Sequence, residues 1–246
     1  MEISEEKLCF SEALLTVGEH QIYTSRLQPS NPRPDNLTVL ILHGAGTADS
    51  SRHDGLAEMF ARQGVAVLSL DFLGHGKSPG GITDGNLDFR IQCALSAVRH
   101  WTDDATPLVL CGFSMSGHVA LRLSVKLGSR VKSLGLFCPA TYAAEAESVN
   151  FGPEFTKIIR VTDSWKSSPA LQDATEFNGR AAIVMGAHDD VIPWEVVSQT
   201  ARALAQNATN VRLEVVGGVR HLLAAYLSGN PGFSEPLVEY LIGNQA

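Results

Sequence analysis

The sequence predicts an α/β protein with a mostly parallel central sheet and helices on both faces of that sheet. Short apolar, β-branched runs alternate with segments of helix length along most of the chain, the pattern of strand–helix–strand units. Most runs are almost continuously apolar, as is typical of parallel strands buried on both faces. The length of 246 residues suits one large domain, and a hydrophobic content of 44% suffices for a sizeable core. We therefore expect residues 1–246 to form a single domain.

Individual elements follow from the apolar spacing. The expected parallel strands are 37–42, 65–70, 107–111, 131–137, 181–185 and 211–216. The expected helices are 51–63, 86–101, 116–127, 194–206 and 234–242; in the second of these, apolar residues recur every three or four positions, as on one helix face. The runs 10–17 and 21–27 are expected to form an antiparallel pair at the sheet edge, joined by a turn at Gly18. Three prolines make 29–35 a loop.

One region breaks the alternation. About forty residues, 140–178, contain no good strand, which is too long for an ordinary loop. Phe155, Ile158 and Ile159 within it fall at helical spacing, and the four residues that we expect to contact substrate are Phe151, Phe155, Ile158 and Trp165. We interpret the region as a small inserted lid that covers one end of the sheet. The alternative is a crossover helix with long arms.

Charge and cysteine usage narrow the class of partner and the compartment. The net charge of −7 and the lack of a Lys/Arg cluster disfavour nucleic acid. The N-terminal residues MEISEEKLCF lack the apolar segment of a secretory signal. The sequence contains no run of 18 apolar residues, so no membrane-spanning helix is expected. Cys9, Cys93, Cys111 and Cys138 are scattered, and three lie in or beside apolar segments. We expect reduced thiols and a cytoplasmic protein.

Neither a metal nor a nucleotide cofactor is expected. The histidines and cysteines show no spacing typical of a closed zinc site. The segment GHGKS at 74–78 ends like a phosphate-binding loop, but Asp71 stands where that loop needs its first glycine. We interpret 74–78 as a glycine-rich turn after the strand 65–70.

The candidate nucleophile follows strand 107–111. In open α/β sheets, ligands bind beyond the carboxyl ends of the strands, and this strand runs into GFSMSG at 112–117 and then a helix. Such a strand–turn–helix elbow exposes a serine hydroxyl on a sharp turn that tolerates only small residues two positions either side. Gly112 meets this demand, whereas Ser116 stands where glycine is usual. Ser114 is therefore the predicted nucleophile, against the alternative of a chance G-x-S-x-S on a surface turn.

The strand 37–42 ends in HGAG at 43–46. Glycines there let the backbone approach a ligand, so the amides of Ala45 and Met115 are expected to form an oxyanion hole. His43 has two interpretations: a catalytic base, or a histidine that braces the loop. We favour the second.

Two further strand ends supply a candidate acid and base. Strand 181–185 runs into GAHDDVIP, in which Asp189 and Asp190 compete for the role of the acid. We favour Asp189, which leaves capping of the helix that begins near Trp194 as an alternative role for Asp190. Strand 211–216 ends in a glycine-softened loop that carries His221, which can reach across the sheet as the base.

These motifs together resemble the α/β-hydrolase superfamily over nearly the whole chain. They are HGAG at 43–46, DFLGHGKS at 71–78, GFSMSG at 112–117, GAHDDVIP at 186–193 and the histidine loop at 217–221. The chain order Ser, Asp, His is the order of that superfamily. Within it, the sequence is similar to monoacylglycerol lipases and lysophospholipases, and to small microbial carboxylesterases, including feruloyl esterases. The resemblance implies an α/β-hydrolase fold with a Ser114–His221–Asp189 triad.

The expected activity is hydrolysis of a small-molecule carboxylic ester through an acyl-enzyme on Ser114. A thioesterase, an acyltransferase or a C–C bond hydrolase can use the same triad. An epoxide hydrolase or dehalogenase would need an aspartate in place of Ser114. The non-enzymatic alternative is a ligand-binding protein that keeps the α/β-hydrolase fold.

Overall fold

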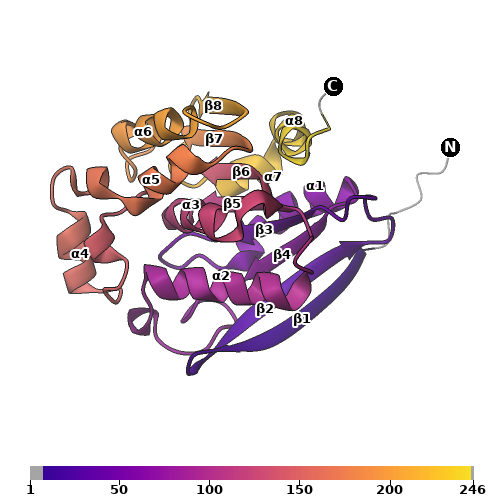
Figure 1. The fold of residues 1–246 in the computed structure, drawn as a ribbon, viewed down its shortest axis with the longest axis horizontal. Coiled ribbons are helices and arrows are strands. Elements are labelled where there is room, and N and C mark those ends of the chain that lie inside the picture. The colour runs from indigo at the N-terminus through magenta and orange to yellow at the C-terminus, as the bar shows by residue number, and fades with distance from the viewer. Residues whose placement is uncertain (1–7, 245–246) are drawn as a thin grey trace.

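The computed structural model describes residues 8–244, which contain an eight-stranded sheet in the order β1-β2-β4-β3-β5-β6-β7-β8 (Figure 1). The strands are β1 (Leu8–Val17), β2 (His20–Pro29), β3 (Thr38–Leu42), β4 (Ala66–Leu70), β5 (Leu108–Phe113), β6 (Val131–Phe137), β7 (Arg180–Gly186) and β8 (Asn210–Val216). From β4 to β8 every neighbouring pair is parallel, whereas β2 is antiparallel to both β1 and β4. The predicted mostly parallel sheet with an antiparallel edge is confirmed.

Helices cover both faces of this sheet (Figure 1). They are α1 (Asp54–Arg62), α2 (Leu87–Trp101), α3 (Met115–Leu127), α4 (Pro153–Ile159), α5 (Pro169–Glu176), α6 (Trp194–Leu204), α7 (Leu223–Gly229) and α8 (Pro231–Ile242). Contacts join α2, α3, α5 and α6 in series into one layer, and α1, α7 and α8 into the other. None of the helices between residues 8 and 244 has both the length and the apolar character needed to cross a bilayer.

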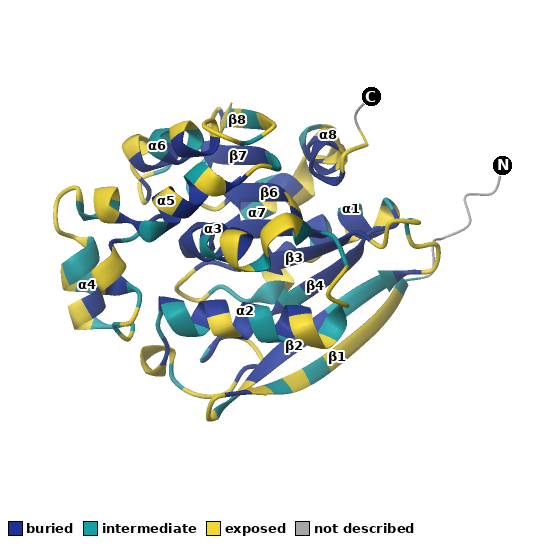
Figure 2. Ribbon diagram, in the orientation of Figure 1, coloured by how far each residue is buried: buried dark blue, intermediate teal, exposed yellow. Residues whose placement is uncertain are grey.

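The core lies in the middle of the sheet, as the burial colours of Figure 2 show. Every residue of β3 and β5 is buried, as expected for parallel strands covered on both faces. The outermost strand β8 departs from this expectation: Leu213 is 37% and Val215 50% exposed. The reason is visible in its sequence, because Arg212 and Glu214 alternate with the apolar residues and a strand with a polar alternation suits a sheet edge.

The segment 140–178 contains no strand, but it is not all lid. Its second half contains α5, which packs against α3 and α6 and so belongs to the helix layer. The helix α4 stands apart from that layer at one side of the molecule (Figure 1). The structure thus contains the crossover helix of the second interpretation in α5, and a lid around α4 stays a prediction. Of the predicted domain 1–246, residues 1–7 and 245–246 lie outside the described residues.

Candidate active site

Ser114 occupies a sharp turn between β5 and α3. Its backbone has φ 51° and ψ −115°, a combination that non-glycine residues rarely adopt and that costs about 1–3 kcal/mol. Three hydrogen bonds hold the turn: the Ser114 amide donates to the Phe137 carbonyl over 2.8 Å, and the Ser114 carbonyl accepts from the amides of Gly117 and Ala140, each over 2.9 Å. Phe137 at the end of β6 and Ala140 just after it therefore bind the amide and the carbonyl of the strained residue.

Small residues are needed around the turn, at the predicted position Gly112 and also at Gly117. A Cβ atom on Gly112 would overlap the carbonyl oxygen of Ser116, and one on Gly117 would lie 2.5 Å from Cβ of Pro139. Ser116 itself is fully buried, and its hydroxyl donates to the His43 carbonyl over 2.5 Å. The serine in place of the usual glycine therefore fits, and it ties the turn to the end of β3.

The structure brings the hydroxyl, the imidazole and the carboxylate into one hydrogen-bonded chain. Nε2 of His221 lies 2.9 Å from Oγ of Ser114, and Nδ1 of His221 lies 2.8 Å from Oδ2 of Asp189. The three residues follow β5, β8 and β7 respectively. This arrangement lets the imidazole take a proton from the hydroxyl while the carboxylate holds its other nitrogen.

Asp189 is fixed on both of its oxygens. Oδ1 accepts from the amides of Val191 (2.9 Å) and Ile192 (3.0 Å), which leaves Oδ2 for His221. Burial raises the pKa of Asp189, but hydrogen bonds from the Cys138 thiol, His221 and the two amides outweigh it, and the net pKa is below the ordinary value. The side chain is therefore an ionised carboxylate at neutral pH.

Asp190 takes no part in this chain of bonds. It forms an ion pair with Arg220 in which both side chains are exposed. The residue that precedes α6 is Pro193, and α6 has no side-chain cap. The alternative role of Asp190 as the cap of this helix is wrong, because the side chain turns to Arg220 instead.

His43 braces its loop. It is fully buried, and its Nε2 accepts from the Phe72 amide over 3.0 Å. Its Nδ1 lies 2.8 Å from the Gly44 carbonyl and therefore carries the proton. Burial and the charge of Arg90 hold the pKa of His43 well below its ordinary value. Both ring nitrogens thus bind backbone groups, which agrees with the bracing interpretation.

The two expected oxyanion donors lie beside Ser114. Met115 is the first residue of α3, so its amide has no partner within the helix. The loop 43–46 packs directly on the turn, since a Cβ atom on Gly44 would lie 3.3 Å from Cβ of Ser114. Ala45 lines the same cavity as Ser114. The positions suit the predicted oxyanion hole, whose role stays a prediction.

A mostly apolar cavity of about 520 Å³ opens at Ser114. Its walls are Gly44, Ala45, Ala48, Arg52, His53, Phe113, Ser114, Phe137, Val191, His221, Leu222, Leu223, Ala224 and Ala225. Most of these lie next to a motif that the sequence identified. His53 and the residues of α7 were missed, because no periodicity or strand end marked them.

The four lid residues expected to contact substrate do not line this cavity. Phe155 is 4% exposed, and its ring lies 5.1 Å from that of Phe151 and 5.6 Å from that of Tyr142. Ile158 and Trp165 are partly buried against the same core. These apolar side chains pack the segment 140–178 against the rest of the domain, and their contact with substrate stays a prediction.

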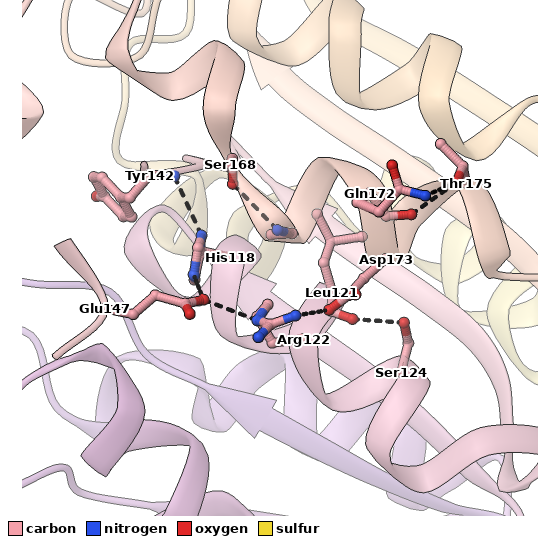
Figure 3. Close-up of polar contacts among 11 residues, drawn as sticks. His118, Leu121, Arg122, Ser124, Tyr142, Glu147, Ser168, Gln172, Asp173 and Thr175 are labelled. Carbon is pink, nitrogen blue, oxygen red and sulfur yellow. Dashed lines mark hydrogen bonds and ion pairs between the residues drawn. The ribbon is translucent and has the colours of Figure 1, made fainter. Parts of the chain in front are cut away.

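A polar network fastens the insertion to α3 (Figure 3). His118 of α3 is fully buried; its Nε2 lies 2.9 Å from Oε1 of Glu147, and its Nδ1 accepts from the Tyr142 amide over 3.2 Å. Arg122, one turn further along α3, pairs with Glu147 over 2.8 Å and with Asp173 of α5 over 2.5 Å. One helix thereby binds both ends of the segment.

The thiol of Cys138 lies behind the carboxylate. Sγ of Cys138 and single ligand atoms of Asp189 and His221 lie within 4.8 Å of one another, a grouping that the sequence spacing did not reveal. Burial raises the pKa of the Cys138 thiol, and the protonated thiol donates to Asp189. Cys93 and Cys111 are also buried, while Cys9 is exposed.

His53 gives a prediction about pH. Its ring stacks on Phe113 at 3.9 Å, neither ring nitrogen has a partner among the described residues, and burial lowers its pKa from 6.5 to about 4. Between pH 6.5 and about 4 the imidazole of His53 is protonated in the unfolded chain but neutral in the folded protein. The free energy of unfolding therefore falls as the pH drops below about 6.5. From pH 7.5 to 5.5 we expect His53 to remove about 1 kcal/mol from the free energy of unfolding.

Urea unfolding of the wild type and of His53→Phe at both pH values measures this effect. The phenylalanine keeps the stacked ring but cannot titrate, so its loss of stability between the two pH values should be smaller by that amount. Equal losses in the two proteins would show that the unfolded and folded states bind the proton at His53 alike.

Comparison with known proteins agrees with this geometry. Residues 33–166 match the sequence profile of the family described as serine aminopeptidase, S33. The chain is 25% identical to the uncharacterized protein YfhR of Escherichia coli over 87% of this chain and 74% of YfhR. It is 28% identical to the lipase LipV of Mycobacterium tuberculosis over 70% of this chain, and it spans only 58% of LipV.

Among solved structures, Est1E from Butyrivibrio proteoclasticus with bound ferulic acid has a TM-score of 0.69 at 18% identity, and the match covers 92% of this chain and 98% of Est1E. At that identity the likeness concerns the fold. The family match covers more than half of the chain and includes the turn at Ser114. The chain therefore belongs to the serine aminopeptidase S33 family of hydrolases and has the α/β-hydrolase fold.

Proposed function

We propose that this protein is a serine hydrolase that cleaves a carboxylic ester through an acyl-enzyme on Ser114. The observation that carries the proposal is the chain of hydrogen bonds from Oγ of Ser114 through His221 to Asp189, with donor–acceptor distances of 2.9 and 2.8 Å. Ser114, at one end of this chain of hydrogen bonds, lines the cavity, so a substrate carbonyl can reach its hydroxyl.

The proposed mechanism has two halves. In the first, His221 takes the Ser114 proton as Oγ attacks the acyl carbon, and the protonated imidazole returns that proton to the leaving alcohol. In the second, His221 takes a proton from water as the water oxygen attacks the acyl carbon. The tetrahedral intermediate then collapses, the protonated imidazole returns the proton to Oγ of Ser114, and the acid leaves. Asp189 stabilises the imidazolium in both halves, and the amides of Ala45 and Met115 hold the negative oxygen of each tetrahedral intermediate.

The size and lining of the cavity favour a substrate with an acyl or aryl group of moderate size. Its volume of about 520 Å³ and its alanine, leucine and phenylalanine walls favour an apolar group beside the ester. The lipase LipV and Est1E with ferulic acid are relatives or structural neighbours whose names agree with ester chemistry. Thioester hydrolysis, acyl transfer and C–C bond hydrolysis would use the same three side chains.

A substrate panel tests the proposal. We expect wild-type protein to hydrolyse p-nitrophenyl esters of short to medium acyl chains faster than matched acyl-coenzyme A thioesters and vinylogous diketones. Each rate is compared with that of Ser114→Ala, so that only turnover through Ser114 counts. Thioester or diketone turnover that exceeds ester turnover would replace the proposed reaction while keeping the triad.

A further inference from the structure

We propose that Arg90 is a positioning residue for the oxyanion hole: it holds the carbonyl of Gly44 so that the amide of Ala45 faces the reacting oxygen. The inference rests on the proposed function, because it gives a role in that reaction to a residue that touches neither substrate nor Ser114. It also accounts for a buried cation in α2 that the triad does not use.

The geometry of one peptide unit links the two residues. The carbonyl of Gly44 and the amide of Ala45 belong to the same peptide, and in a trans peptide these two groups point in opposite directions. No cis peptide occurs among residues 8–244. Fixing the direction of the Gly44 oxygen therefore fixes the direction of the Ala45 N–H.

Two donors fix that oxygen from the protein interior. Nη1 of Arg90 donates to the Gly44 oxygen over 3.1 Å, and Nδ1 of His43 donates to it over 2.8 Å. Both donor residues are buried, whereas Ala45 lines the cavity at Ser114. With the carbonyl drawn inward, the N–H of Ala45 is turned to the cavity side.

The loop needs such an anchor. Gly44 packs against Ser114 with room for no more than a tight Cβ contact, so the residue there must be small. A glycine leaves the adjoining peptide free to rotate at little steric cost. Without its two donors, the peptide between Gly44 and Ala45 could turn its carbonyl into the cavity, where it would repel an oxyanion.

Arg90 is held in one orientation by its own contacts. Its guanidinium lies 4.3 Å from the centre of the Phe72 ring, and Nη2 lies 3.4 Å from Nε2 of His75. Nδ1 of His75 lies 2.9 Å from the Leu73 carbonyl, so Nδ1 carries the proton and Nε2 accepts from Arg90. The histidine of the glycine-rich turn at 74–78 thus orients the arginine beneath the loop 43–46.

The burial of Arg90 is costly, which indicates a role beyond packing. The residue is 2% exposed and forms no ion pair with any carboxylate in the described part of the chain. A buried charge without a partner of opposite sign is strongly unfavourable. Burial lowers its pKa only to about 10, so the side chain is cationic at neutral pH. Its unneutralised charge lies behind the peptide whose amide faces the developing negative oxygen.

The test separates positioning from folding. We would measure kcat and KM for p-nitrophenyl butyrate, the Ki of a trifluoromethyl ketone with the same acyl chain, and the melting temperature. The variants are Arg90→Met and Arg90→Lys, and the control is Arg130→Met. Arg130 is a partly buried arginine that, like Arg90, donates to backbone carbonyl groups, but it lies at the opposite end of the parallel strands, beside Thr106 and Asp103.

For Arg90→Met we expect kcat to fall by about 10- to 100-fold, somewhat less than the loss of a whole oxyanion donor. KM should change by less than about two-fold and Ki should rise by the same factor as kcat falls, because the ketone adduct carries the oxyanion and the ground state does not. Arg90→Lys should recover part of the loss, since lysine keeps the charge but lacks the planar fork. Arg130→Met should match the wild type in kcat and Ki.

Unchanged kcat and Ki in folded Arg90→Met would overturn the inference, as would a parallel loss in Arg130→Met. If Arg90→Met does not fold, Arg90→Lys decides: wild-type kcat and Ki in that variant count against the inference, and an intermediate loss in both supports it. Ser114→Ala is measured alongside. Wild-type turnover equal to that of Ser114→Ala refutes the proposed function itself, whereas an inactive Ser114→Ala with a normal Arg90→Met refutes only the role of Arg90.

Discussion

Replacing Ser114 by alanine is expected to lower the turnover of a p-nitrophenyl ester by on the order of 10³-fold or more. The hydroxyl is the atom that the imidazole of His221 approaches at 2.9 Å, and alanine offers nothing to attack the acyl carbon. The cavity and the oxyanion donors remain, so some residual rate above water is expected. The measurement is steady-state kcat on purified protein.

Ser124→Ala provides the matched control for that variant. Ser124 is a buried serine of the same helix, α3, and its hydroxyl donates only to the Leu121 carbonyl. Its removal should leave kcat within about two-fold of wild type, because the residue lies outside the triad. A Ser114→Ala protein as active as Ser124→Ala would show that the reaction does not pass through Ser114.

Asp189→Asn is expected to lower kcat by about 10³- to 10⁴-fold, chiefly by imposing the wrong tautomer on His221. The two amides at Val191 and Ile192 donate to Oδ1, so they will bind the carbonyl oxygen of an asparagine and leave its NH₂ group facing Nδ1 of His221. Nδ1 must then accept, which places the ring proton on Nε2. In that state the imidazole cannot take the proton of Ser114.

Asp190→Asn is the control for Asp189→Asn. Its carboxylate is exposed and pairs only with the exposed Arg220, and surface ion pairs contribute little to stability. We expect kcat within about two-fold of wild type. The pair of variants is compared in one esterase assay at pH 7.5; a larger loss in Asp190→Asn than in Asp189→Asn would reverse the assignment of the acid.

The sequence was informative about the fold wherever burial is complete. Strand 131–137 is found with the same bounds, and the other five expected parallel strands differ by one or two residues at their ends. The prediction from sequence was less accurate at the edge of the sheet. It treated β8 as buried on both faces, although Arg212 and Glu214 indicate one exposed face. Helix α7 was missed, because seven residues are too few to show a period, and α5 was anticipated only as a crossover helix without bounds within 140–178.

Within the site, the residues at strand ends could be predicted and those that depend on packing could not. Ser114, Asp189 and His221 each follow a buried strand, so the geometry of a parallel sheet brings them together. The sequence of an amphipathic helix indicates its apolar face but not the surface against which that face packs. Phe155 accordingly packs on Phe151 and Tyr142, while α7 lines the cavity instead.

The role of Arg90 also lay beyond the sequence. The residue lies within an expected helix but outside its apolar period and outside every motif, and its contact with Gly44 joins positions 46 residues apart in the chain. Ser116 is a milder example: the sequence showed that a small residue was required there, but its hydrogen bond to the His43 carbonyl emerged only from the structure.

Labelling with a fluorophosphonate probes the central claim, the activation of the Ser114 hydroxyl by His221, most directly. Intact mass should show one phosphonyl group per wild-type chain, peptide mapping should place it on Ser114, and neither Ser114→Ala nor His221→Ala should react at the wild-type rate. A folded wild-type protein that stays unlabelled, or that is labelled at another residue, would contradict the account.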